Sequence, residues 1–153
     1  MTRAERLLIA ALACASVAGS AQALSFSPAP TSFTASGVLY LTGQQASTKC
    51  EVSLKGKVTK KGVVNINSLS FKGSSQCTGT AATALPWKAL ASGPTLGKIL
   101  NFGFAGSFFG TCGPGSVPFT DNSSGVWTLA GSIPGGCSVN GTLSTSPAIV
   151  IVP

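Results

Sequence analysis

Apolar and polar residues alternate with a period of two along much of the chain after residue 23. Between residues 50 and 58, for example, Cys50, Val52, Leu54 and Val58 are separated by polar or charged residues. This period places successive side chains on opposite faces of a β-strand. The pattern predicts strands at Ser32–Leu41, Lys49–Val58, Val63–Phe71, Leu85–Ala91, Ile99–Phe104, Ser116–Thr120, Val126–Ala130, Ser138–Leu143 and Ala148–Val152.

Turn-forming residues separate these segments, and no stretch after residue 23 has a sustained helical period with caps. Many short strands at this spacing are typical of an antiparallel sandwich or barrel. We therefore expect an all-β fold, a single antiparallel β-sandwich or barrel-like domain over residues 24–153.

Two hairpins bounded by cysteines stand out, from Cys50 to Cys77 and from Cys112 to Cys137. The first turns at Lys60-Lys61-Gly62 and the second at 122–125, which ends in Gly125. A tight hairpin needs a residue that tolerates positive φ, and glycine does so without steric cost. The similarity suggests an internal duplication; a chain rich in strands and glycine can also resemble itself without one.

The two ends of the predicted domain have distinct patterns. Leu24–Pro30 contains Pro28 and Pro30, which favour an extended leader over a helix. The last strand, Ala148–Val152, is apolar on both faces, so it is expected either to be buried between layers or to pair with another chain.

Residues 1–23 have the pattern of a secretory signal peptide. Two arginines precede the apolar stretch Leu7–Val17, and Ala21-Gln22-Ala23 supplies small residues for cleavage. The stretch is too short to span a ~30 Å hydrocarbon core. Cys14 raises the alternative of a lipidated cysteine, although the better cleavage site lies beyond it. We expect an exported protein, periplasmic or extracellular, without a transmembrane segment in the mature chain.

Four cysteines remain after residue 23: Cys50, Cys77, Cys112 and Cys137. An even number in an exported chain predicts two disulfides, and the absence of a CxxC pair argues against zinc, so we expect no metal site. Four cysteines allow three pairings; the hairpins favour Cys50 with Cys77 and Cys112 with Cys137.

Several short segments, taken in order, resemble one known family: residues 31–37 (TSFTASG), 39–42 (LYLT), Leu85-Pro86-Trp87, 112–115 (CGPG) and 137–142 (CSVNGT). Together they resemble the alkane oxidation protein activator family of the PraB type. The resemblance implies a small exported bacterial protein that supports growth on, or contact with, long-chain hydrocarbons without known catalytic activity. It supplies no active-site residues.

The residue inventory argues against catalysis and cofactor binding. The segment after residue 23 has no histidine, and its only carboxylates, Glu51 and Asp121, are 70 positions apart in sequence. General acid–base pairs therefore cannot be assembled. A serine–lysine dyad would need a desolvated lysine beside a positioned serine, and no pair is singled out. We expect no enzyme and no cofactor.

Two features could bind a partner. Lys55, Lys57, Lys60 and Lys61 form a basic tip suited to polyanions, or a solvated face that maintains solubility. Nucleic acid is not expected, because the chain after residue 23 has no arginine for bidentate phosphate recognition.

The second feature is a glycine-rich segment with four phenylalanines. There we expect Phe102 and Phe104 in the core, and we expect Phe108 and Phe109 to form an apolar contact if their loop is exposed. Trp87 and Trp127 are interpreted as core anchors.

These features lead to one main functional hypothesis and two alternatives. The main one is a secreted, non-enzymatic accessory protein that supports alkane utilisation or contact at the cell surface or biofilm matrix, through hydrocarbon or the envelope. The alternatives are a self-assembling extracellular subunit, joined through Leu24–Pro30 or Ala148–Val152, and a polyanion- or carbohydrate-binding module.

Overall fold

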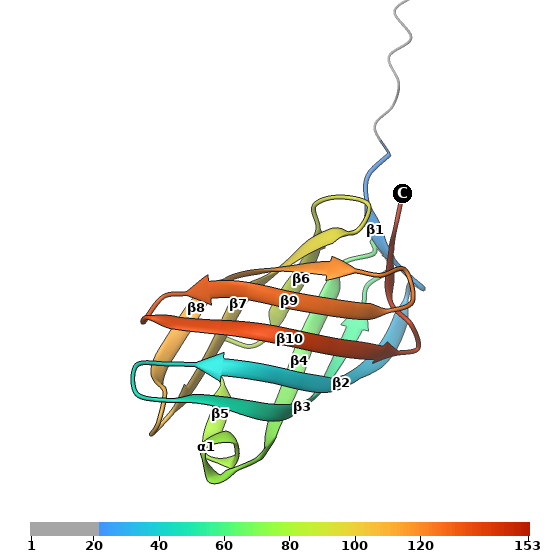
Figure 1. Ribbon diagram of the computed structural model, residues 1–153. Helices are drawn as coiled ribbons and strands as arrows, with labels where there is room; N and C mark the ends of the chain where they lie inside the picture. The colour runs from blue at the N-terminus through green and yellow to red at the C-terminus, as the bar shows by residue number, and fades with distance from the viewer. Residues whose placement is uncertain (1–21) are drawn as a thin grey trace, which may run out of the picture.

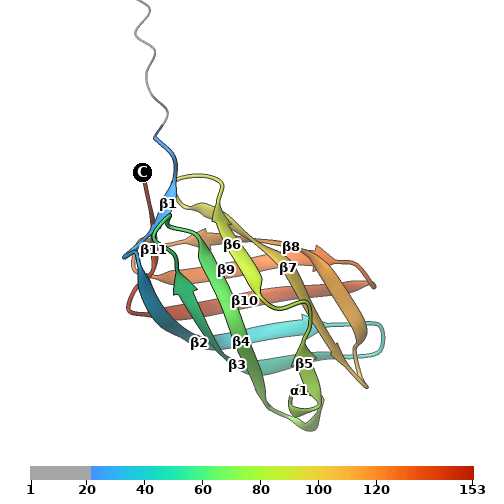
Figure 2. The ribbon, with the colours of Figure 1, turned by 180° about the vertical axis from the view of Figure 1, so that it is seen from behind.

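A computed structural model describes residues 22–153, and β-strands dominate it (Figures 1 and 2). The predicted signal peptide lies outside the described residues except for its last two. The elements are β1 (Ser25–Ser27), β2 (Thr31–Thr42), β3 (Ser47–Val58), β4 (Val64–Gly73), α1 (Ser75–Thr78), β5 (Thr80–Ala82), β6 (Trp87–Ala91), β7 (Leu96–Gly106), β8 (Gly110–Asp121), β9 (Val126–Ile133), β10 (Cys137–Ser146) and β11 (Val150–Val152).

Eight of the strands form a closed antiparallel barrel in the order β7-β6-β4-β3-β2-β10-β9-β8, and β8 pairs back to β7. The short strand β5 pairs with the end of β7 that β6 does not reach. Strands β2, β10 and β9 on one side cross β4, β6 and β7 on the other at a steep angle (Figures 1 and 2). The predicted all-β class is confirmed, and the architecture is a barrel.

All nine predicted strands are present, with shifted boundaries, whereas β1, β5 and α1 were not predicted. The largest boundary difference is in β8, which begins at Gly110 and not at Ser116. Glycine and proline at 113–115 do not interrupt this strand: Gly113 adopts φ +82 within it and the pairing continues past it.

Both predicted hairpin turns are present, and each has its glycine at positive φ. Gly62 has φ +72 in the β3–β4 turn and Gly125 has φ +79 in the β8–β9 turn. A Cβ on Gly62 would collide with the Cβ of Ser25, so the turn also packs closely against β1. No other residue would fit at Gly62 without displacing β1.

Aromatic side chains fill the barrel interior in two groups. One contains Phe26, Phe33, Phe119 and Trp127, with the last two rings stacked at 4.6 Å between centroids. The other contains Phe71, Trp87, Phe102, Phe104 and Phe109. The predicted burial of Phe102, Phe104 and both tryptophans is confirmed. Each indole N–H has a carbonyl acceptor, on Thr83 for Trp87 and on Ile149 for Trp127.

A pair of β-bulges between β7 and β8 decides which phenylalanines of this segment face inward. From Ile99 to Phe102 the chain of β7 has one residue more than β8, and between Phe102 and Phe104 the extra residue lies on β8. The first bulge centres on Asn101, at φ +61, and turns Asn101 outward and Phe102 inward. Without the extra residue, strict alternation from Ile99 would place Phe102 and Phe104 outside.

A two-stranded ribbon of β1 and β11 closes one end of the barrel, which we call the ribbon end. Phe26 of β1 packs against the stacked rings of Phe119 and Trp127. The buried Asp121 carboxylate accepts hydrogen bonds from the Ile151 N–H (2.9 Å) and the Ser123 N–H (3.2 Å). The apolar last strand thus pairs within its own chain, and the extended leader is its partner strand.

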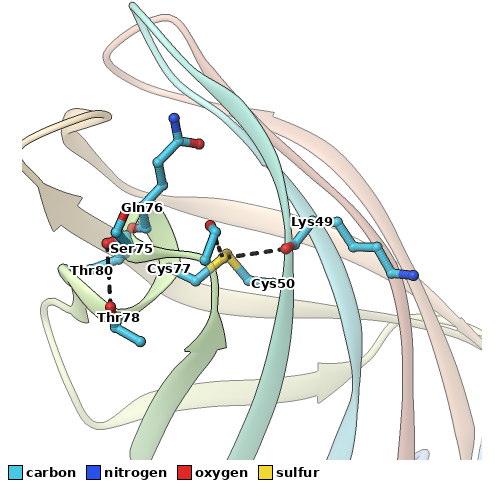
Figure 3. Close-up of a disulfide and its surroundings, with 8 residues drawn as sticks. Lys49, Cys50, Ser75, Gln76, Cys77, Thr78 and Thr80 are labelled. Carbon is cyan, nitrogen blue, oxygen red and sulfur yellow. Dashed lines mark hydrogen bonds between the residues drawn. A yellow bond between two sulfur atoms is a disulfide. The ribbon is translucent and has the colours of Figure 1, made fainter.

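The opposite end, which we call the disulfide end, carries both disulfides. They join Cys50 to Cys77 and Cys112 to Cys137, which confirms the pairing favoured by the hairpins. Cys77 lies on α1, where its sulfur is 3.3 Å from the Lys49 carbonyl oxygen (Figure 3). The hydroxyl of Thr80 donates to the Gln76 carbonyl at 2.6 Å, which fixes α1 to β5. Each disulfide closes a loop of 25 or 27 residues, worth about 3 kcal/mol in the chain-entropy model.

The bulge at Asn101 predicts a specific sensitivity to substitution. Asn101→Val should lower the free energy of unfolding by about 1–3 kcal/mol, because a β-branched residue is strained at positive φ. Asn101→Gly should unfold at the wild-type urea midpoint or above it. Equal midpoints for the two variants would contradict a left-handed backbone at this position.

The hydrogen bonds of Asp121 predict that the ribbon depends on this carboxylate. Asp121→Ala should lower the free energy of unfolding by about 1–3 kcal/mol, because it leaves the buried Ile151 N–H without an acceptor. Hydrogen exchange at the Ile151 amide should be faster, whereas Thr120→Ala, an exposed neighbour, should leave it unchanged. Unaltered protection of Ile151 in the Asp121 variant would refute the assignment.

Candidate functional site

Exposed charge is confined to one half of the barrel's outer surface. All eight lysines of the described residues are exposed, and they lie on β3, β4, β6, β7 and the β3–β4 turn: Lys49, Lys55, Lys57, Lys60, Lys61, Lys72, Lys88 and Lys98. We call this half the lysine face. The four predicted polyanion contacts, Lys55, Lys57, Lys60 and Lys61, all belong to it.

The other half presents outward side chains without charge, and we call it the uncharged face. It consists of the outer surfaces of β2, β10, β9 and β8. Its exposed strand residues include Ser32, Thr34, Ser36, Tyr40, Asn140, Thr142, Ser144, Ser146, Thr128, Ala130, Ser132, Ser116, Pro118 and Thr120. Asp121 is the acidic residue of these strands, and it is buried. This face offers mainly hydroxyl and methyl groups for contact. It carries no charged group that would have to lose its hydration when the face contacts another surface.

A shallow groove of about 370 Å³ lies near the ribbon end, where β8 and β9 of the uncharged face meet β7. Leu96, Pro118 and Ala130 line it together with threonines at 120 and 128. Leu96 is 50% exposed, the highest value among the large hydrophobic residues of the described chain. We call this feature the apolar groove. The sequence alone does not reveal this groove, because its residues come from three strands and only the register of those strands brings them together.

The adjacent phenylalanines at the β7–β8 turn have opposite environments. Phe108 is 42% exposed, as an apolar contact requires. Phe109 is fully buried, with its ring edge-on to Phe104 at 5.5 Å and its backbone against Gly43. The prediction that Phe109 offers an exposed contact is therefore wrong: the turn directs one ring into the disulfide end of the core and the other into solvent.

The chemical groups needed for catalysis or metal binding are sparse in the part of the chain that the structure describes. Within residues 22–153, no group of three or more His, Cys, Asp or Glu side chains is placed to hold a metal ion. Both oxygens of the Asp121 carboxylate accept backbone N–H groups, so it has a structural role. Over the same residues, no helix has the length and apolar character required to cross a membrane.

Fold and surface define the class of this protein: a disulfide-bonded antiparallel β-barrel whose outside is divided into a lysine face and an uncharged face. The chain belongs to the family described as alkane oxidation protein activator PraA/PraB-like, whose model matches residues 1–153. The resemblance seen in the sequence is thereby confirmed. Neither the curated proteins nor the solved structures contain a match to the chain.

The contrast between Phe108 and Phe109 predicts different responses to truncation. Phe109→Ala should lower the free energy of unfolding by about 3–5 kcal/mol through cavity formation, and Phe108→Ala should change it by less than about 0.5 kcal/mol. Urea unfolding of the oxidised protein measures both. Comparable losses in the two variants would contradict the assigned orientations.

Proposed function

We propose that this protein is an exported, non-enzymatic accessory factor in alkane utilisation that adsorbs to hydrocarbon through its uncharged face and the exposed Leu96 and Phe108 at the edge of that face. Family membership supports a role in alkane oxidation. Two disulfides are typical of an oxidising, non-cytoplasmic compartment, in agreement with the signal peptide predicted from the sequence.

The segregation of charge is the observation that carries this proposal. A protein that adsorbs to an alkane surface must remove water from the contacting face, and a hydrated ammonium group on that face would oppose adsorption. The exposed lysines leave the outward positions of β2, β10, β9 and β8 free of charge. At the edge of this face, Leu96 at the start of β7 and Phe108 in the β7–β8 turn expose apolar surface, and Lys98, which pairs with Pro118, marks the border with the lysine face. The lysine face would remain in water and keep the adsorbed protein hydrated.

A non-catalytic role is supported by the positions of the carboxylates. Glu51 lies on the exposed surface of β3, and Asp121 is buried at the ribbon end on β8. They therefore cannot act as a pair on one substrate. Lysines face solvent and are not desolvated beside a serine, as a serine–lysine dyad would require.

Self-assembly through the ends of the chain has less support. The segments considered for insertion into a neighbour, Leu24–Pro30 and Ala148–Val152, contain β1 and β11, which pair with each other. Phe26, Ile149 and Ile151 are buried at the ribbon end. Strand exchange would first have to break this ribbon and expose these side chains to water.

Partitioning between buffer and dispersed hexadecane tests the proposal. The oxidised protein without residues 1–23, confirmed as monomer, should leave the aqueous phase, and Leu96→Ser/Phe108→Ser should reduce the adsorbed fraction severalfold. Both substitutions remove apolar surface that is already exposed, so they should leave the fold intact.

Leu85→Ser is the matched control, because Leu85 is 37% exposed but precedes β6 on the lysine face. It should adsorb as the wild type does. Absence of wild-type adsorption, or an equal loss in the Leu85 variant, would refute adsorption through the uncharged face.

A further inference from the structure

A second groove, of about 500 Å³, lies where β3 and β4 are out of register. Lys55 pairs with Ser68 and Gly56 pairs with Ile66, so Asn67 is the extra residue of a β-bulge on β4. Bulges redirect side chains and are over-represented beside functional sites. Lys55, Lys57 and Asn67 line the groove. We call it the basic groove.

Glycine at position 56 is required for the floor of this groove. A Cβ on Gly56 would lie 2.7 Å from the Phe33 ring and 2.8 Å from the Asn65 carbonyl oxygen. The backbone at Gly56, between Lys55 and Lys57, is therefore in direct contact with the core, and a side chain would not fit there. The opposite wall comes from β2 and β10, which contribute the hydroxyl groups of Ser32, Thr34 and Ser146.

Two lysines line the basic groove, and a third lies beyond β4, two strands away. Lys55 and Lys57 point outward from the same strand, about 7 Å apart. Lys57 pairs with Asn65, and Asn65 pairs with Lys88, so Lys88 lies two strands from Lys57, at about 10 Å.

The acidic residues of the described chain do not neutralise this cluster. Glu51 is four residues along β3 from Lys55, or about 13 Å, and Asp121 is buried at the ribbon end. The positive potential over the groove is thus available to an anion.

The lining favours one class of anion. The hydroxyl-bearing Ser32 and Thr34 lie directly across from Lys57 and Lys55 on the neighbouring strand, which suits a polyhydroxylated chain bearing single negative charges. Stacking of nucleic acid bases needs exposed aromatic rings, and Phe33, the aromatic residue of the groove, is only 3% exposed. Lysine also supplies point charges and not the bidentate fork that arginine offers to phosphate.

We propose that the basic groove binds an acidic polysaccharide, with Lys55, Lys57 and Lys88 contacting carboxylates and Ser32, Thr34, Asn67 and Ser146 bonding to sugar hydroxyls. Its lining includes neither Leu96 nor Phe108, and it lies at the border between β3 of the lysine face and β2 and β10 of the uncharged face. The protein can therefore hold a hydrated anionic glycan at this border and hydrocarbon near Leu96 and Phe108. The two activities are separable by substitution.

Calorimetric titration of the oxidised protein with polygalacturonate oligosaccharides tests this proposal. Wild-type protein should bind, with an affinity that falls as salt is raised, and methyl-esterified oligosaccharides of the same length should not bind. Lys55→Gln/Lys57→Gln should raise the Kd at least tenfold. Near-ultraviolet circular dichroism establishes that the variants keep the wild-type fold.

Lys49→Gln/Lys98→Gln is the control with the same loss of net charge outside the groove, and its Kd should rise less than threefold. Equal losses in the two double variants would reduce the effect to overall charge and overturn the proposal. Failure of the wild type to bind would also overturn it, as would tighter binding to a DNA oligonucleotide of matched charge. Hexadecane partitioning should be unaffected by Lys55→Gln/Lys57→Gln.

Discussion

Pairing of β7 with β8 closes the barrel, and the rest of the structure depends on this closure. A closed sheet satisfies the backbone hydrogen bonds of both strands, which an open sheet would leave free for aggregation or strand addition. It also fixes an inside and an outside for every strand, so a period of two in sequence becomes a division between core and solvent. The paired bulges near Asn101 and Gly113 adjust this seam by placing an extra residue first on one strand and then on the other.

The two ends of the barrel are sealed by different means. Hydrophobic insertion and a buried carboxylate hold the β1–β11 ribbon, where Phe26 fills the interior and Asp121 accepts the Ile151 N–H. Covalent bonds hold the opposite end, where Cys50–Cys77 fixes α1 and Cys112–Cys137 ties the start of β8 to β10. Both solutions protect the hydrophobic core from water. Leu96 and Phe108 are among the few large apolar side chains of the described residues that stay exposed outside it.

Because the core and both ends are covered, the outward side chains are the ones available for binding. Their chemical character differs from strand to strand. Lysines occupy β3, β4, β6 and β7, and hydroxyl-bearing or apolar residues occupy β8, β9, β10 and β2. Different strands of a closed barrel face different directions, so residues of different character can be placed on different sides. One such barrel could therefore contact an apolar phase and an aqueous polymer at the same time. This arrangement agrees with an accessory role in alkane oxidation and requires no catalytic group.

The sequence by itself determined the strands, both hairpin turns, the disulfide pairing favoured by them and the outward direction of Lys55 and Lys57, because these follow from local alternation and from glycine at positive φ. Tertiary structure decided what depends on pairing between distant segments: closure of the barrel, β1 with β11, and the apolar groove around Leu96 and Pro118. It also decided between Phe108 and Phe109, since alternation cannot be followed through bulges and a turn. Register across the whole barrel sets those positions, and register is a non-local property that no single segment encodes.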